Sequence, residues 1–241
     1  MNRLQEVHAG VYLVGSPELT APEDCCVYLV DLGDLVMIDA GAGRSVSAIL
    51  ENVASLGLSH KRISAVIATH CHIDHVGGIP KLRERTRCQV IVHELDAAAM
   101  ESGDPVKTAA EWYNLSFPPT PVDYQLSEVR EVLKFARGEL LCLHTPGHTP
   151  GSISVILDYD GKRVLFGQDI HGPFSDSFGS DLAAWKKSME VLLGLQADIL
   201  CEGHFGIYRP EAEVKRYIQN YLEMYRKNKK KGFNAVPRGA G

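Results

Sequence analysis

The segment from Thr69 to Gly78, THCHIDHVGG, places four metal-capable side chains within six positions, directly after the apolar run Ile63–Ala68. A short apolar run of this kind is typical of a buried strand. Imidazole nitrogens and carboxylate oxygens are ligands for zinc and other first-row divalent ions. Burying four such groups at one strand end would be costly without a common partner, so the segment predicts a metal site. The four side chains are His70, His72, Asp74 and His75.

The spacing within this segment predicts more than one ion. In an extended stretch, His70 and His72 project to the same side of the chain. If the chain then turns into a helix, Asp74 and His75 swing toward a neighbouring point. The pair Gly77-Gly78 would let the backbone pack closely there. A single ion needs only three of the four side chains, and the surplus favours two ions.

Three further polar side chains follow apolar strands later in the chain. His148 lies in the Pro/Gly-braced segment 145–151, Asp169 follows the apolar run that ends at Phe166, and His204 follows the run 198–201. A strand end is a rigid support from which such a side chain can point into a cleft. The remaining histidines are interpreted as surface residues or hydrogen-bonded core residues. They include His8, His60, His93 and His144.

The chain repeats one order of elements in two halves, in which strands and a strand hairpin precede a helix. The first half has expected strands at 11–14, 25–30, 35–38, 63–68 and 89–92, and expected helices at 44–57, 79–85, 95–101 and 106–115. The second half has expected strands at 129–135, 139–143, 152–157, 163–166 and 198–201, and expected helices at 181–193 and 211–226. Two such halves predict an α/β protein with two sheets packed face to face and helices outside. We expect one domain, residues 1–232, and a flexible tail, residues 233–241.

Taken together, these motifs resemble the metallo-β-lactamase superfamily over nearly the whole chain. The resemblance rests on MIDAG at 37–41, the His-x-His-x-Asp-His segment, PGHT at 146–149, the strand end at Asp169 and the late pair Gly203-His204. It implies a four-layer αββα sandwich with the metals at one edge. It also implies that His70, His72 and His148 hold the first metal, that Asp74, His75 and His204 hold the second, and that Asp169 bridges them. Asp39 matches the acid that supports the ligands.

The implied cofactor is a pair of divalent ions, zinc in the first instance, with iron or manganese as alternatives. Two such ions about 3.5–4 Å apart lower the pKa of a shared water and hold a bridging hydroxide near neutral pH. The catalytic role falls to Asp74, which is placed to orient the hydroxide and then move a proton. The sequence therefore favours an enzyme, a metal-dependent hydrolase of a small-molecule ester or thioester.

Several branches of the superfamily remain open. An aspartate at position 169 argues against a true β-lactamase. Glyoxalase II enzymes match the ligand set best. The short stretch after His204 argues against a glutathione-binding region like theirs. A mononuclear iron persulfide dioxygenase shares the same positions and is the alternative. A phosphodiesterase or ribonuclease is less favoured, because the net charge is −5 and the basic run 226–231 is typical of a solvated helix end. The segment 112–121 is either a lid or a peripheral cover, and His171 either binds substrate or makes a supporting hydrogen bond.

Composition sets the expected compartment and partners. No apolar run approaches the roughly 18–20 residues of a membrane span, and the first residues lack a secretory pattern. The six cysteines lie mostly in strand-like apolar runs, so we interpret them as buried free thiols in a reducing cytoplasm. The expected partner is a small-molecule substrate, without a membrane or nucleic acid, and a homo-oligomer is left open.

Overall fold

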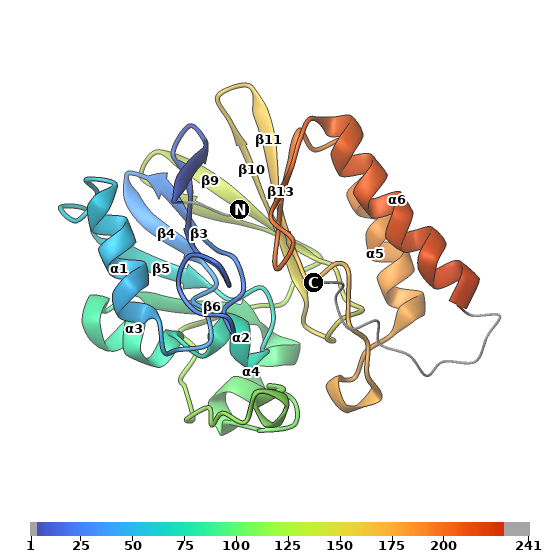
Figure 1. Ribbon diagram of the computed structural model, residues 1–241, viewed down its shortest axis with the longest axis horizontal. Coiled ribbons are helices and arrows are strands. Elements are labelled where there is room, and N and C mark those ends of the chain that lie inside the picture. Colours follow the sequence, from blue (N-terminus) through green and yellow to red (C-terminus); the bar gives the residue numbers. More distant parts are fainter. Residues whose placement is uncertain (1–3, 229–241) are drawn as a thin grey trace.

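Two β-sheets lie face to face between two helical layers in the computed structural model, which describes residues 4–228 (Figure 1). On one side are α1 (Val46–Ser55) and α3 (Ile79–Thr86), at the left of Figure 1. On the other side are α5 (Leu182–Gly194) and α6 (Glu211–Asn228), at the right. The expected αββα sandwich of an α/β protein is confirmed.

The first sheet has seven strands in the order β1-β2-β3-β4-β5-β6-β7. Its strands are β1 (Gln5–His8), β2 (Val11–Gly15), β3 (Val27–Leu32), β4 (Asp34–Ile38), β5 (Ile63–Ile67), β6 (Gln89–His93) and β7 (Tyr124–Leu126). From β4 onward, neighbouring strands run parallel. The carboxyl ends of β4 and β5 therefore meet at the same edge of the sheet.

The second sheet has six strands in the order β13-β12-β11-β10-β9-β8. Its strands are β8 (Arg130–Phe135), β9 (Gly138–His144), β10 (Ile153–Tyr159), β11 (Lys162–Gln168), β12 (Ile199–Glu202) and β13 (Ile207–Tyr208). The pair β11 and β12 is parallel, whereas β10 is antiparallel to both β9 and β11. The strands β9, β11 and β12 therefore share one direction, and their carboxyl ends lie at one edge.

Apolar side chains along β3 and β4 alternate between two cores. Leu29 and Met37 pack in the core under α1 and α3, whereas Tyr28 and Ile38 pack in the core between the sheets. This period of two follows from the pleat of a strand, which sends successive side chains to opposite faces. Tyr28 meets Phe166 of the second sheet edge-on, with ring centroids 5.6 Å apart. The strands β3 and β4 are thus buried on both faces.

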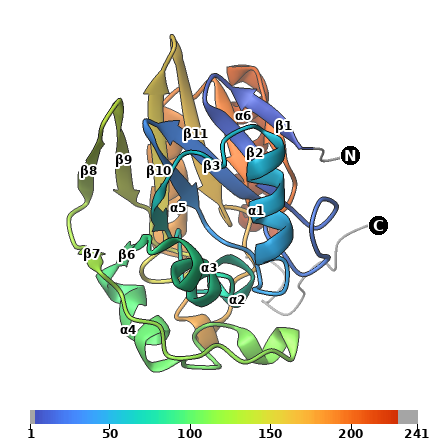
Figure 2. The same ribbon diagram turned by 90° about the vertical axis from the view of Figure 1, so that its left-hand side faces the viewer.

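Amphipathic helices close the two outer faces, as the turned view shows for α1 and α3 (Figure 2). On α1 the buried residues are Val46, Ile49 and Val53, spaced at three and four positions. On α5, Trp185 and Met189 lie four positions apart and pack on the second sheet with residues of α6. A third core therefore lies between that sheet and its helices.

The expected elements are present except in one region, where the helix predicted over 106–115 is a single 3-10 turn. Its bounds are Ala110–Tyr113, and Ala109 before it and Asn114 after it both have positive φ angles, which interrupt a helix. Sequence patterns did not indicate β1, β7 or β13. The other short elements are α2 (Ile73–Val76), α4 (Glu94–Ser102) and a 3-10 turn, η2 (Asp176–Phe178).

Two composition-based expectations concern the whole chain. All six cysteines are buried and free, as predicted. Among residues 4–228, every helix is too short or too polar to pass through a bilayer. The predicted tail, residues 233–241, lies outside the described residues.

Candidate metal centre

All seven candidate ligands lie at the strand-end edge that the two sheets share. His70 and His72 follow β5, and the short helix α2 carries Asp74 and His75. From the second sheet, His148 follows β9, Asp169 follows β11 and His204 follows β12. The structure thus brings together side chains that span positions 70 to 204 of the sequence.

One cluster consists of three histidines and one carboxylate oxygen of Asp169, Oδ2. The ligand atoms of His70, His72, His148 and Asp169 all lie within 4.8 Å of one another. His148 Nε2 is 2.9 Å from His72 Nδ1 and 3.4 Å from Asp169 Oδ2. His70 Nε2 is 3.9 Å from the same Asp169 oxygen. Three nitrogens and an oxygen thus surround one point.

A second cluster uses the other oxygen of Asp169. Asp169 Oδ1 is 3.2 Å from His75 Nε2 and 3.3 Å from His204 Nε2. Asp74 Oδ2 lies 3.3 Å from His204 Nε2 and 3.7 Å from His75 Nε2. The two oxygens of Asp169 therefore face different clusters, which is the arrangement of a carboxylate placed between two ions.

Buried atoms without hydrogen bonds supply a test of whether metal ions fit. His70 Nε2, His75 Nε2 and Asp169 Oδ1 are buried and have no hydrogen-bond partner among residues 4–228. Buried polar groups are normally paired, because an unpaired one loses its hydration without compensation. All three atoms point into the clusters, and a divalent cation in each cluster would satisfy them. The residues present therefore fit two metal ions.

Burial sets the protonation of the first cluster. It lowers the pKa of His148 to about 4 and, together with the neighbouring histidines, holds the pKa values of His70 and His72 well below the ordinary value. These imidazoles are therefore neutral at pH 7, and the neutral ring is the form that binds a metal.

In the second cluster, neighbouring charges outweigh burial and favour the ionised forms of the side chains. Burial opposes ionisation of Asp74, but His75 and His204 beside it lower its pKa. Burial likewise opposes the charge on His204, but Asp169 and Asp74 raise its pKa to about 10. Without a cation, protons on histidines balance the carboxylates, and a metal ion would displace those protons on binding.

Asp39 supports the candidate ligand His75 through a hydrogen bond to the ring nitrogen that faces away from the cluster, as the sequence predicted. Its Oδ2 accepts from His75 Nδ1 at 2.7 Å and from Thr69 Oγ1 at 2.8 Å, and its Oδ1 accepts from the Thr69 N–H at 2.8 Å. The amide of Gln168 also donates to Oδ2. The bond to Nδ1 fixes the ring so that His75 Nε2 faces the cluster.

Asp96 is a supporting residue that sequence reasoning missed. Its buried carboxylate accepts from the Cys71 N–H at 2.9 Å, between two ligands, and from Thr149 Oγ1 at 2.7 Å and the Gly151 N–H at 2.8 Å, just after His148. It therefore ties two ligand loops together. No pattern distinguishes Asp96 from an ordinary acid in the first turn of a helix.

Two glycines allow the backbone to approach the ligands closely. A Cβ on Gly78 would lie 2.1 Å from the Ala40 carbonyl oxygen, which confirms the close packing predicted at Gly77-Gly78. A Cβ on Gly203 would lie 2.5 Å from Asp169 Oδ1. Gly203 thus leaves the space that the shared aspartate occupies.

The segment 112–121 and His171 both make contacts at or beside the candidate ligands. Part of the segment 112–121 lies at the centre, because Tyr113 donates a hydrogen bond to Asp74 Oδ2 at 2.8 Å. Phe117 of the same segment is instead buried in the core under α1 and α3. His171 Nδ1 is 2.6 Å from the buried Glu202 carboxylate, so this histidine makes a supporting hydrogen bond.

An αββα sandwich with two His/Asp clusters that share one aspartate at its strand-end edge defines a metallo-hydrolase. The chain belongs to the metallo-beta-lactamase superfamily, whose pattern matches residues 22–204.

Relatives of this chain are named for different activities. A probable metallo-hydrolase of Methanocaldococcus jannaschii is 31% identical over 131 residues, 54% of this chain and 61% of that protein. A ribonuclease of Thermus thermophilus is 30% identical over 207 residues, 83% of this chain and 45% of its own length. An acyl-coenzyme A thioesterase of Gallus gallus is 32% identical over 218 residues, 78% of this chain and 74% of that enzyme. The matches thus cover less than two thirds of the first two relatives.

Among solved structures, a metallo-beta-lactamase of Cronobacter sakazakii with substitutions in its HARLDQ motif superposes with a TM-score of 0.79. It is 22% identical, and the match covers 95% of this chain and 98% of that one. This likeness supports the fold alone.

Proposed function

We propose that this protein hydrolyses a small-molecule ester or thioester with two divalent ions. His70, His72 and His148 would hold the first ion, Asp74, His75 and His204 would hold the second, and Asp169 would contribute to both. The observation that carries the proposal is that the two oxygens of Asp169 face two separate clusters. When bound, the ions would supply Lewis-acid activation of a water and of the substrate carbonyl. Zinc suits this set of imidazole and carboxylate ligands, with iron or manganese as alternatives.

Asp74 is the catalytic residue in this proposal. Its Oδ2 faces His75 and His204. We therefore assign to Oδ1 the role of accepting the proton of the attacking water. The water oxygen bonds to the carbonyl carbon, the bond to the leaving sulfur or oxygen breaks, and Asp74 returns the proton to that leaving group. The products are a carboxylic acid and a thiol or alcohol.

A thioester is the first substrate class to test, because a relative that matches most of this chain is named an acyl-coenzyme A thioesterase. The ligand set is also the one that resembles glyoxalase II enzymes, which cleave thioesters. The six buried free thiols favour a reducing compartment, and we propose the cytoplasm.

Substitution of two proposed ligands tests the site. We expect His72→Ala and Asp74→Ala to lose metal, measured by elemental analysis, and nearly all hydrolysis of acyl-coenzyme A and simple ester substrates. His60→Ala is the matched control, because His60 is exposed and bonds only to the local Gly57 carbonyl among the described residues. Full metal content and full activity in either ligand variant would refute the proposal.

The alternatives predict different readouts from the same preparation. A persulfide dioxygenase would contain about one iron per chain and consume oxygen with glutathione persulfide. A ribonuclease, the name carried by the Thermus relative, would cleave RNA or a phosphodiester and leave thioesters intact. We expect about two ions per chain and thioester or ester cleavage without oxygen uptake.

A further inference from the structure

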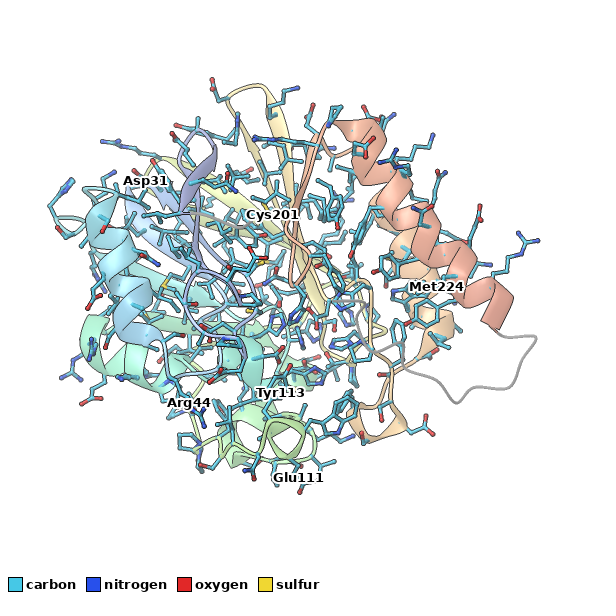
Figure 3. The ribbon with its side chains drawn as sticks, in the orientation of Figure 1. Asp31, Arg44, Glu111, Tyr113, Cys201 and Met224 are labelled. Carbon is cyan, nitrogen blue, oxygen red and sulfur yellow. The ribbon has the colours of Figure 1, made fainter. Side chains whose placement is uncertain are left out.

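The hydroxyl of Tyr113 reaches the metal centre from a different segment than any candidate ligand. It donates to Asp74 Oδ2 at 2.8 Å, the same oxygen that lies 3.3 Å from His204 Nε2. The residue is nevertheless 37% exposed. Figure 3 places Tyr113 at the lower edge of the sandwich, with Glu111 of the same turn farther out. The phenol therefore lies where solvent meets the second cluster.

The segment that carries Tyr113 is anchored to the ligand loop. The Ile73 N–H donates to the Thr108 carbonyl at 2.7 Å, one residue after His72. The neighbouring Trp112 packs on Phe178, with ring centroids 4.6 Å apart, and Phe178 packs on His72 at 4.3 Å. A backbone hydrogen bond and two tilted or edge-on ring contacts thus fix the position of the hydroxyl relative to the candidate ligands.

A change of acceptor gives this hydroxyl a chemical role. In the absence of a cation, the Asp74 carboxylate is a strong acceptor, because hydrogen bonds to ionised groups are stronger than those to neutral ones. A cation held by Asp74 would draw negative charge away from that oxygen. During ester cleavage, negative charge builds up on the substrate carbonyl oxygen, and a donor positioned beforehand stabilises that charge. The phenol would then favour the substrate oxygen over Asp74.

We propose that Tyr113 is a further catalytic residue, whose hydroxyl donates a hydrogen bond to the carbonyl oxygen of the substrate as the tetrahedral state forms. This proposal rests on the proposed ester or thioester hydrolysis and adds a donor from the protein itself. Tyr113 is not a metal ligand in this role.

The test compares Tyr113→Phe with Tyr124→Phe. Tyr124 is a matched control, because it is 46% exposed and its hydroxyl also donates to a carboxylate, that of Glu131 on β8. Tyr113→Phe should keep wild-type metal content and KM within about threefold but lower kcat about 100-fold, the size expected for one lost oxyanion donor. Tyr124→Phe should match the wild type in all three quantities.

A binding measurement separates this proposal from the proposed function. We would titrate the metal-loaded proteins with a phosphonate analogue, in which a tetrahedral phosphorus replaces the scissile carbonyl carbon, and with the carboxylate product. Tyr113→Phe should bind the phosphonate about 10–100-fold more weakly and the product as the wild type does, since only the tetrahedral ligand mimics the charge that the donor stabilises. Wild-type protein that binds the phosphonate but cleaves no ester or thioester would count against the proposed function alone. Equal phosphonate affinity in all proteins, no binding by any of them, or metal loss in Tyr113→Phe would overturn the role of Tyr113.

Discussion

At the scale of single residues, the outer hydrogen-bond partners of His75 and His148 select which ring nitrogen faces the centre. The Nδ1 of His75 contacts Asp39, and the Nδ1 of His148 donates to the Pro173 carbonyl at 2.6 Å, so Nε2 faces inward in both. His72 differs, because its Nδ1 faces His148 Nε2. Such outer partners set the tautomer and raise the basicity of a ligand. For His75 and His148, the hydrogen bond at Nδ1 is therefore almost as important for metal binding as the ring itself.

Replacement of Asp39 by asparagine tests this support. Asp39 accepts hydrogen bonds from Thr69, His75 and Gln168, whereas an asparagine would present an NH₂ group to some of those donors. Asparagine tolerates the positive φ of this position, 61°, so backbone strain is not the cause of any effect. We expect Asp39→Asn to weaken metal affinity about 10–100-fold, measured by competition with a chromogenic chelator. Asp31→Asn, which alters an ion pair with Lys61 and a turn hydrogen bond from the Gly33 N–H, should leave that affinity unchanged.

Gly203 offers a test of the shared carboxylate without touching a ligand. Because a Cβ at this position would lie 2.5 Å from Asp169 Oδ1, Gly203→Ala must displace that side chain. We expect at least one ion per chain to be lost and kcat to fall about tenfold or more, since small misplacements of catalytic groups have effects of this size or larger. Gly194→Ala is the control, because nothing lies within 4 Å of its added Cβ. Equal metal content in both variants would contradict a bridging Asp169.

At the scale of elements, the centre depends on where strands stop and short segments turn. The sequence patterns located β5, β9, β11 and β12 and the polar residue after each one, because buried strands are continuous apolar runs. The anticipated turn into a helix exists as α2, only four residues long. The backbone conformation of residues 104–121 could not be predicted from the spacing of apolar residues. Ala109 and Asn114 adopt positive φ angles, which that spacing does not reveal. Tyr113 was therefore named as part of a lid or cover, but its contact with Asp74 was not predictable.

His93, at the start of α4, supplies a pH prediction for an element outside the centre. Its Nδ1 accepts from the Leu95 N–H, its Nε2 is buried without a partner among the described residues, and its ring stacks on His144 at 3.9 Å. Burial and then His144 lower its pKa to about 4, against the attraction of Glu131. The unfolded chain therefore takes up this proton first as the pH falls. The contribution to stability is complete above pH 6.5 and is lost as the pH falls from there toward about 4.

His93→Asn removes this titration and keeps an acceptor for the helix start, since asparagine is a favoured N-cap. Urea midpoints measured with chelator present, from pH 7 to pH 4.5, should fall less steeply in His93→Asn than in the wild type. The chelator excludes metal release as a source of the difference. His60→Asn, at an exposed position, should parallel the wild type. Parallel curves for wild type and His93→Asn would show that His93 does not titrate in this window.

At the scale of the whole molecule, sequence order predicted which residues converge and one of the residues that support them, Asp39, but not Asp96. The seven candidate ligands were identifiable because each lies in a segment that follows an apolar strand. Asp96 could not be found in this way, since its partners, Cys71, Thr149 and Gly151, are distant in sequence and two of them are backbone N–H groups. Such contacts depend on the packing of both halves, which local pattern does not encode.

Metal removal tests whether the centre holds the two halves together. His70, His72, Asp74 and His75 come from the first half of the chain, and His148, Asp169 and His204 come from the second. Ions that bind only the folded state stabilise it by about 4 kcal/mol when free metal exceeds Kd by about 1,000-fold. For a chain of this length, 1 kcal/mol shifts Tm by about 2–4 °C. We therefore expect EDTA to lower Tm by roughly 8–16 °C for each ion removed and zinc to restore it. His72→Ala should respond much less, because it lacks a ligand of the first ion, whereas a wild-type Tm that is indifferent to EDTA would mean that folding and metal binding are not coupled.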